Sequence, residues 1–252
     1  MTATATALLA LIVLCAFVSE AALGFGATVI TVTLGAHLVP LDVILPAFVP
    51  LNLCLSAWLV VRGRRAIDRP LLVRRILPLV AVGLVFGLAL FRWQSALALQ
   101  LAFALFVVTI AAVELARFAL ARGRAADPLP WAAGVALLVA GGFVHGLFAS
   151  GGPMIVAFAG REVQDKTAFR STLAALWLIL NGALVANYAG VGLFSRATAA
   201  LSATLAPSLL AGLALGGWAH DKLNERSFRF LVYLLLLFAG ATLALRTYGK
   251  LA

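Results

Sequence analysis

The sequence predicts an all-α, polytopic membrane protein. Hydrophobic residues make up 64% of the 252 residues and charged residues only 11%, whereas soluble domains are about 45–50% apolar and about 25% charged. A chain of this composition has too little polar surface to coat a soluble globule, but it suits a bundle that faces lipid. Its apolar residues also gather into segments close to the roughly 20 residues that span a bilayer.

These apolar segments follow one another along the whole chain. The first carries no basic residue before it and runs past the length of a signal peptide, so we expect it to be retained. Short connections separate the others and carry most of the charge. We expect membrane segments near 5–23, 43–61, 76–91, 95–116, 131–149, 171–193, 199–219 and 228–245.

The basic residues indicate how the chain crosses the membrane. Fifteen of the nineteen lie in the connections 62–75, 117–124, 161–170 and 222–229, and basic connections gather on the cytoplasmic side. All four share one side only if segment 131–160 turns back within the membrane. Ser150-Gly151-Gly152-Pro153 is a natural turning point because Gly and Pro disfavour a helix interior. We therefore expect a re-entrant hairpin there and four cytoplasmic connections.

Two patterns recur in the halves of the chain. Residues 78–87 and 207–216 both read P-x4-G-x3-G, and such glycine pairs let helices approach closely. A shift of 126 residues also aligns FVSEAALGFGATVI (17–30) with FVHGLFASGGPMIV (143–156). The repeat predicts two halves, 1–125 and 126–252, each a broken helical hairpin plus three transmembrane helices. Because three crossings are odd in number, the halves are expected to be inverted repeats.

These features resemble the TauE/SafE family of sulfite and organosulfonate exporters, also called the 4-toluene sulfonate uptake permease (TSUP) family. The resemblance covers nearly the whole chain and rests on the two halves, the P-x4-G-x3-G spans, and the breaks at Gly24-Phe25-Gly26-Ala27 and Ser150-Gly151-Gly152. It implies transport of small sulfur-containing anions such as sulfite, thiosulfate or sulfoacetate, without a nucleotide motor. We expect a multi-pass protein of the bacterial inner membrane.

The breaks themselves predict an anion site. Each exposes backbone N–H groups where its second helix begins, near Ala27 and Pro153, and these donors and the helix dipole favour an anion. Glycines let a ligand approach the backbone; close helix packing alone is the alternative reason for them. We predict a site near the membrane midplane whose substrate-binding residues are Gly24, Gly26, Thr28, Ser150, Gly151, Gly152, Asn52, Asn181 and Arg170.

Two ionisable residues lie in apolar segments beside the breaks. Glu20 is one turn before Gly24, and His145 is at the adjacent position of the second half. Ionisable residues inside a membrane usually have a function, and we expect Glu20 and His145 to carry the proton that drives transport. A structural Glu20, bonded across helices or reaching an aqueous vestibule, is the alternative.

The remaining features exclude several classes of function. The net charge of +10 lies in short connections, so nucleic acid is not an expected partner. Cys15 and Cys54 form no disulfide or metal-ligand pattern, and we expect no metal and no cofactor. The expected partners are a small sulfur-containing anion, protons and the lipid bilayer; homo-oligomers remain open. Most tryptophans are expected at the membrane interfaces, and His220 at the surface.

Two other transport functions are alternatives to proton-coupled transport of a sulfur oxyanion. A passive anion channel would use the same donors without Glu20, and another small organic anion would fit the same breaks. An enzyme is not expected. Phe148-Ala149-Ser150-Gly151 is similar to the serine turn of intramembrane serine proteases, but His145 lies about 140° around the helix from Ser150 and cannot serve as its base.

Overall fold

The computed structural model describes residues 2–91, 96–120, 129–222 and 225–250, and these residues contain no strand. Eight of their helices are long and apolar enough to cross a membrane, which confirms the predicted all-α, polytopic fold. The elements are α1 (Ala3–Leu23), α2 (Ala27–Gly35), α3 (Leu41–Gly63), α4 (Arg69–Leu71), a π-helical turn η1 (Leu72–Ile76), α5 (Leu77–Phe91), α6 (Ala96–Leu120), α7 (Trp131–Phe148), α8 (Gly152–Glu162), α9 (Lys166–Gly190), α10 (Arg196–Lys222) and α11 (Glu225–Tyr248).

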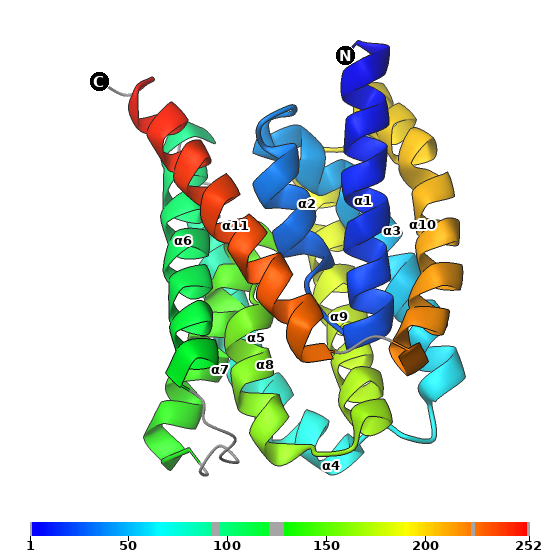
Figure 1. The fold of residues 1–252 in the computed structure, drawn as a ribbon, viewed down its shortest axis with the longest axis vertical. Coiled ribbons are helices and arrows are strands. Elements are labelled where there is room, and N and C mark those ends of the chain that lie inside the picture. Colours follow the sequence, from blue (N-terminus) through cyan, green and yellow to red (C-terminus); the bar gives the residue numbers. More distant parts are fainter. Residues whose placement is uncertain (1, 92–95, 121–128, 223–224, 251–252) are drawn as a thin grey trace.

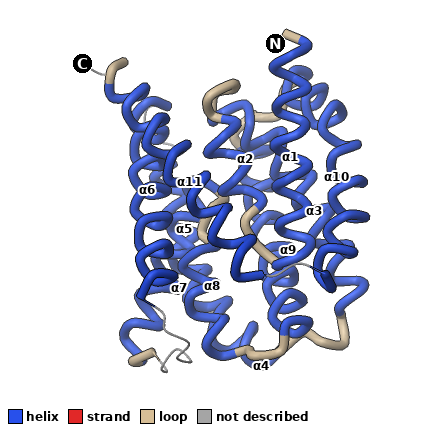
Figure 2. The backbone as a smooth tube through the Cα atoms, viewed as in Figure 1, coloured by secondary structure: helices blue, strands red, loops and turns tan. Residues whose placement is uncertain are grey.

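Both predicted breaks interrupt a helical hairpin. Helix α1 runs into the bundle from the end that holds the N-terminus, and α2 returns toward that end (Figure 1). Helix α7 enters from the opposite end, and α8 returns there. The connections between the helices of each pair are the loop segments in the middle of the bundle in Figure 2. The structure thus confirms a broken hairpin in the first as well as the second predicted position.

Two of the basic connections lie at one end of the bundle. The connection that contains α4 and the one between α8 and α9 are both at the lower end in Figure 1, whereas α10 finishes higher, beside the end of α1. Residues 121–124 of the connection 117–124 and residues 223–224 of the connection 222–229 lie outside the described residues. The turn back at the second break produces this arrangement, because it returns the chain to the side from which α7 started.

Small residues bring the helices into direct backbone contact. Helix α5 packs on α7, and α1 packs on α10. A Cβ atom at Gly83 would lie 1.9 Å from the carbonyl oxygen of Val139, and one at Gly212 would lie 2.5 Å from Cβ of Phe17. The glycines of the two P-x4-G-x3-G spans therefore provide the close approach that their spacing predicts.

The outer surface of the bundle is apolar. Large hydrophobic side chains such as Leu231, Phe238 and Leu245 are mostly exposed, as expected for a surface whose solvent is lipid. The polar side chains behave in the opposite way, because Glu20, Asn52, His145, Ser150 and Asn181 are all buried. The polar groups that could bind a substrate or exchange a proton therefore lie in the interior of the protein.

Candidate functional site

Two left-handed residues form the first break. Gly24 has φ 87° and closes α1 by donating its N–H to the carbonyl of Glu20 at 2.7 Å, while Gly26 has φ 106° and caps the start of α2. Side chains rarely adopt such φ values, so glycine is required at both positions. The chain reverses within three residues as a result, and α2 begins at Ala27, as predicted.

The second break uses different residues for the same reversal. Ala149 takes the left-handed conformation with φ 53° and donates its N–H to the carbonyl of His145 at 2.7 Å. Ser150 follows, and its hydroxyl donates to the carbonyl of Phe148 at 2.8 Å. Helix α8 then begins at Gly152, with Pro153 in its first turn. Pro at this position lacks only an N–H that would have no partner within the helix.

The two breaks face one small buried cavity. Seven of the eleven predicted site residues line it, together with Val29, Ala149 and Trp177; the seven are Glu20, Gly26, Thr28, Asn52, His145, Ser150 and Gly152. The cavity has a volume of about 20 Å³, which is room for one water molecule. Residues more than 120 positions apart in the chain thus meet at the point where both helices are broken.

The carboxyl group of Glu20 crosses the first break. Its Oε2 atom accepts the N–H of Ala27, the first residue of α2, at 3.1 Å, and Oε1 has no hydrogen-bond partner among the described residues. Asn52 of α3 lies beside this carboxyl group and donates its Nδ2–H to Oγ1 of Thr28 at 3.3 Å. Glu20 is therefore hydrogen-bonded to the start of the very helix that the sequence predicts to hold an anion.

Trp177 of α9 connects the break to His145. Its indole N–H donates to the carbonyl of Gly24 at 2.7 Å, and its ring stacks on the His145 imidazole with centroids 5.5 Å apart and planes at 12°. Asn181 lies beside His145, but neither side chain has a well-formed hydrogen bond within the described residues. Both are donors or acceptors that a ligand could satisfy.

Trp177 differs from the sequence prediction for the tryptophans. It is buried inside the site, whereas Trp58, Trp131 and Trp218 are exposed. His220, expected at the surface, is partly buried, and its Nδ1 atom lies 2.6 Å from the carbonyl oxygen of Ala22. A tryptophan about one helical turn before a buried asparagine, on the same helix face, is the weak signal that could have identified Trp177.

Four predicted site residues lie outside the central cavity. Gly24 and Gly151 serve the backbone, because Gly24 supplies the positive φ and a Cβ at Gly151 would lie 1.9 Å from the carbonyl oxygen of Gly141. Asn181 lies behind His145. Arg170 donates from Nη1 to the carbonyl of Ala21 at 3.2 Å and so stabilises the end of α1.

Arg170 lines a second and much larger cavity. This cavity has a volume of about 530 Å³ and lies among α1, α3, α9 and α10. Arg62, which lies over the Trp58 ring at 4.7 Å, is on its wall, and Leu210 and Leu213 make other parts of the wall apolar. Arg170 also packs directly against the first break, since a Cβ at Gly24 would lie 3.0 Å from Cα of Arg170.

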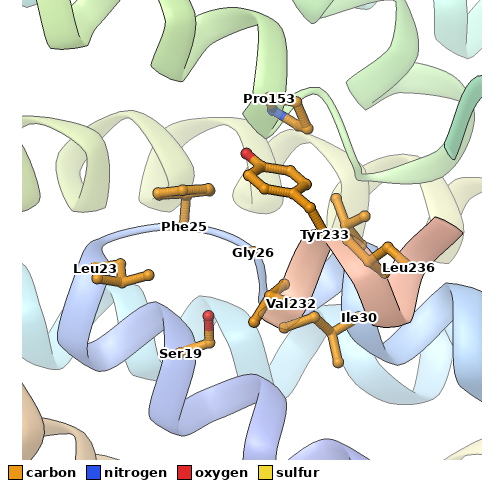
Figure 3. A pocket seen from close by; sticks show the side chains of 10 residues that line it. Ser19, Leu23, Phe25, Gly26, Ile30, Pro153, Val232, Tyr233 and Leu236 are labelled. Carbon is orange, nitrogen blue, oxygen red and sulfur yellow. The ribbon is translucent and has the colours of Figure 1, made fainter. Parts of the chain in front are cut away.

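Helix α11 covers the first break on another side. A small pocket shares Gly26 and Val29 with the central cavity and is otherwise mostly apolar. Figure 3 shows Tyr233 and Leu236 of α11 reaching toward the break, with the Tyr233 hydroxyl near Pro153 at the start of α8. Side chains of α11 thus close the space between the two breaks against the outside of the bundle.

The chemistry available in the central cavity is hydrogen bonding and proton exchange. Among the described residues, no group of three or more His, Cys, Asp or Glu side chains is placed to hold a metal ion. The cavity combines helix N-termini, amides, hydroxyls, one carboxyl group and one imidazole. This is a set of groups that can surround a small oxyanion and exchange a proton beside it.

Comparison with known proteins identifies one family. The family model described as Sulfite exporter TauE/SafE matches residues 9–243, which include both hairpins and every residue of the central cavity. No curated protein and no solved structure matches the chain significantly.

Proposed function

The chain belongs to the sulfite exporter TauE/SafE family, and from this premise we propose that it is a proton-coupled, secondary-active transporter of small sulfur-containing oxyanions. Its substrates are sulfite, thiosulfate or an organosulfonate such as sulfoacetate. It acts in the bacterial inner membrane, with the basic end of the bundle in the cytoplasm. The anion is held between the two broken helices.

One observation carries this proposal: both helix breaks face the same buried cavity. The first N–H groups of a helix have no partner within it, and the partial positive charge at a helix N-terminus favours an anion. Helices α2 and α8 both direct such ends toward the cavity. The amide of Asn52 and the hydroxyl of Thr28 add neutral polar groups, which suit an oxyanion without requiring a fixed cation.

The size of the cavity supports a carrier rather than a channel. About 20 Å³ accommodates one water molecule but not a sulfur oxyanion with its three or more heavy atoms. The hairpins must therefore separate to admit the substrate, and this is the step that alternating access requires. The larger cavity at Arg62 and Arg170 lies toward the basic end of the bundle and is the route by which the anion passes between the site and the cytoplasm.

The packing of the helices supports an inverted repeat. Exchanging the halves 1–125 and 126–252 replaces α1 by α7 and α5 by α10, so the α1–α10 contact becomes the α7–α5 contact. The exchange leaves the α3–α9 and α6–α11 contacts unchanged, because each of them joins two helices that exchange with one another. All four are major helix contacts of the bundle, as a pseudo-two-fold axis between the halves would require. Such an axis places the two breaks face to face.

The site geometry supports transport over hydrolysis. The Ser150 hydroxyl donates to the carbonyl of Phe148, and the His145 ring stacks on Trp177. A serine nucleophile needs a base within hydrogen-bond reach, and neither contact provides one. We assign the two residues to anion binding and proton exchange, respectively.

The test is transport by the purified full-length chain in liposomes. With an acidic exterior, we expect sulfite or thiosulfate to accumulate inside above its external concentration, and collapse of the pH gradient by a protonophore to abolish this accumulation. A Glu114→Gln variant is the matched control, because Glu114 pairs with Arg117 away from the cavity. Anion movement that only ever runs down its own gradient would instead indicate a channel.

A further inference from the structure

We propose that the Glu20 carboxylate is a tethered stand-in for the substrate: it occupies the anion position at the start of α2, and an oxyanion enters only after Glu20 takes up a proton and releases Ala27. A proton and an anion are then bound together and cross the membrane in the same direction. This inference rests on the proposed function and specifies how its coupling works.

The contact between Glu20 and Ala27 is the first support. Glu20 belongs to α1, yet its Oε2 accepts the N–H of Ala27 at 3.1 Å across the left-handed residues Gly24 and Gly26. Ala27 is the first residue of a nine-residue helix, where backbone N–H groups lack helical partners. A carboxylate at this position makes the charge-assisted hydrogen bond that a bound oxyanion would make.

Unsatisfied polar atoms around the cavity are the second, independent support. Oε1 of Glu20, Oδ1 of Asn52 and both ring nitrogens of His145 have no hydrogen-bond partner among the described residues. Each of these side chains is at least 97% buried and lines the cavity. Buried polar groups without partners are rare in folded proteins, so their gathering at one point indicates a ligand.

The Glu20 carboxylate and a substrate oxyanion cannot occupy the cavity together, because both space and charge oppose it. The cavity of about 20 Å³ leaves no room for an oxyanion beside the carboxylate. Two unit negative charges about 4 Å apart inside a protein also repel strongly enough to weaken binding about a thousandfold. Protonation of Oε1 removes this repulsion because it gives a neutral acid. The hydrogen bond from the Ala27 N–H to Oε2 is then no longer charge-assisted, so the acid can leave this position and the oxyanion can replace it.

The described parts of the neighbouring helices bring no second carboxylate to the cavity, so Glu20 is the acidic group of the site. Within the described residues no other carboxylate lines the cavity. Helices α2 and α3 present uncharged Thr28 and Asn52, α7 presents His145, and α11 presents Tyr233 beyond Gly26. The Arg170 and His220 side chains of α9 and α10 bond the carbonyl oxygens of Ala21 and Ala22, so they hold the end of α1.

The decisive experiment measures binding rather than transport. Thiosulfate is the probe, because it stays a dianion from mildly acidic to mildly alkaline pH and its own titration does not interfere. We expect its Kd for the purified full-length protein to rise about tenfold per pH unit above the pKa of Glu20, with uptake of one proton per thiosulfate. Calorimetry in two buffers of different ionisation enthalpy measures both quantities.

Variants assign the effect to Glu20. Glu20→Gln is expected to bind thiosulfate with a pH-independent Kd and without proton uptake, whereas Glu114→Gln keeps the wild-type slope. An unchanged slope in Glu20→Gln, or a slope lost in Glu114→Gln, overturns the inference. The wild-type protein gives a readout that does not depend on variant folding: thiosulfate should raise the infrared band of a protonated carboxylic acid, and a band that does not change overturns the inference too.

These outcomes separate the inference from the proposed function. If thiosulfate, sulfite and sulfoacetate all fail to bind the wild-type protein at any pH, the proposed function is wrong. If one of them binds with the same affinity at every pH and without proton uptake, the anion site stands and the role of Glu20 as a competing anion is wrong.

Discussion

Trp177 illustrates at the scale of single residues how surroundings decide a role. A tryptophan in an apolar segment is often an interface anchor, and Trp58 and Trp218 are exposed, as that role requires. Trp177 is instead 4% exposed and links the carbonyl of Gly24 to the ring of His145. Trp177 therefore connects the first break to a polar residue of the second hairpin.

Replacing Trp177 by phenylalanine should destabilise the first break. The Trp177→Phe variant keeps an aromatic ring against His145 but leaves the Gly24 carbonyl without its donor, which costs about 1–3 kcal/mol for a buried group. We expect a lower thermal unfolding midpoint in detergent and slower anion transport. Trp218→Phe is the control, because Trp218 is 65% exposed; equal midpoints for the two variants would contradict the role given to the Trp177 indole.

Ser150 tests whether the second break forms part of the substrate site. Ser150→Leu places a bulky apolar side chain where a buried serine lines the cavity, so transport should be lost while the protein still reaches the membrane. Thr204→Leu, at an exposed position of α10, is the matched control and should transport normally. Ser150→Ala leaves the space open and should retain part of the activity. Full transport by Ser150→Leu would remove the second break from the site.

The glycine-lined contact between α5 and α7 determines, at the scale of elements, where the second hairpin sits. Gly83 of α5 meets the backbone of α7 at Val139, and Gly142 of α7 meets the backbone of α5 at Val80. This reciprocal contact leaves no space for side chains, so the helix that leads into the second break is fixed against the first half. The first hairpin is held in a similar way by Gly212 and Gly216 of α10.

A methyl group at Gly83 should therefore disrupt the fold. In Gly83→Ala the new Cβ would lie 1.9 Å from the Val139 oxygen, which forces α5 and α7 apart and costs at least the about 1–3 kcal/mol typical of overpacking. The unfolding midpoint should fall clearly. Gly182→Ala is the comparison, since its nearest neighbour would be 4.0 Å away and alanine favours a helix; a midpoint that falls as far in this variant would contradict the packing argument.

The whole molecule has two chemically different ends. The connection with α4 and the connection between α8 and α9 lie at the basic end, while the connection between α9 and α10 lies at the end that holds the N-terminus (Figure 1). The positive-inside tendency predicts that the basic end faces the cytoplasm. In that orientation the cavity at Arg62 and Arg170 opens on the cytoplasmic side of the helix breaks.

Cysteine labelling in intact cells tests this orientation. In a background in which Cys15 and Cys54 are replaced by alanine, Phe194→Cys between α9 and α10 should react with a membrane-impermeant maleimide. Arg64→Cys, just after α3, should react only once the cells are opened. Both positions are exposed, so accessibility alone would not distinguish them. The reverse pattern would place the basic end outside and contradict the proposed topology.

The sequence by itself determined the fold class, the path of the chain and the position of both breaks. Composition is a property of the whole chain, and runs of apolar residues, Gly-Pro clusters and basic connections act locally, so each can be interpreted without knowing what packs against it. The same local logic identified Glu20 and His145, because an ionisable residue inside an apolar segment is conspicuous whatever its neighbours are.

Only the tertiary structure decided which of these residues meet. It joined Glu20 to Ala27, placed Trp177 beside His145, assigned Gly151 to packing against Gly141, and moved Arg170 to a separate cavity. These relations depend on how α9 and α10 rotate and cross α1 and α7, and no local pattern encodes such angles. Contacts between distant segments arise from the packing of entire helix surfaces, which is why the site could be located from the sequence but its hydrogen bonds could not.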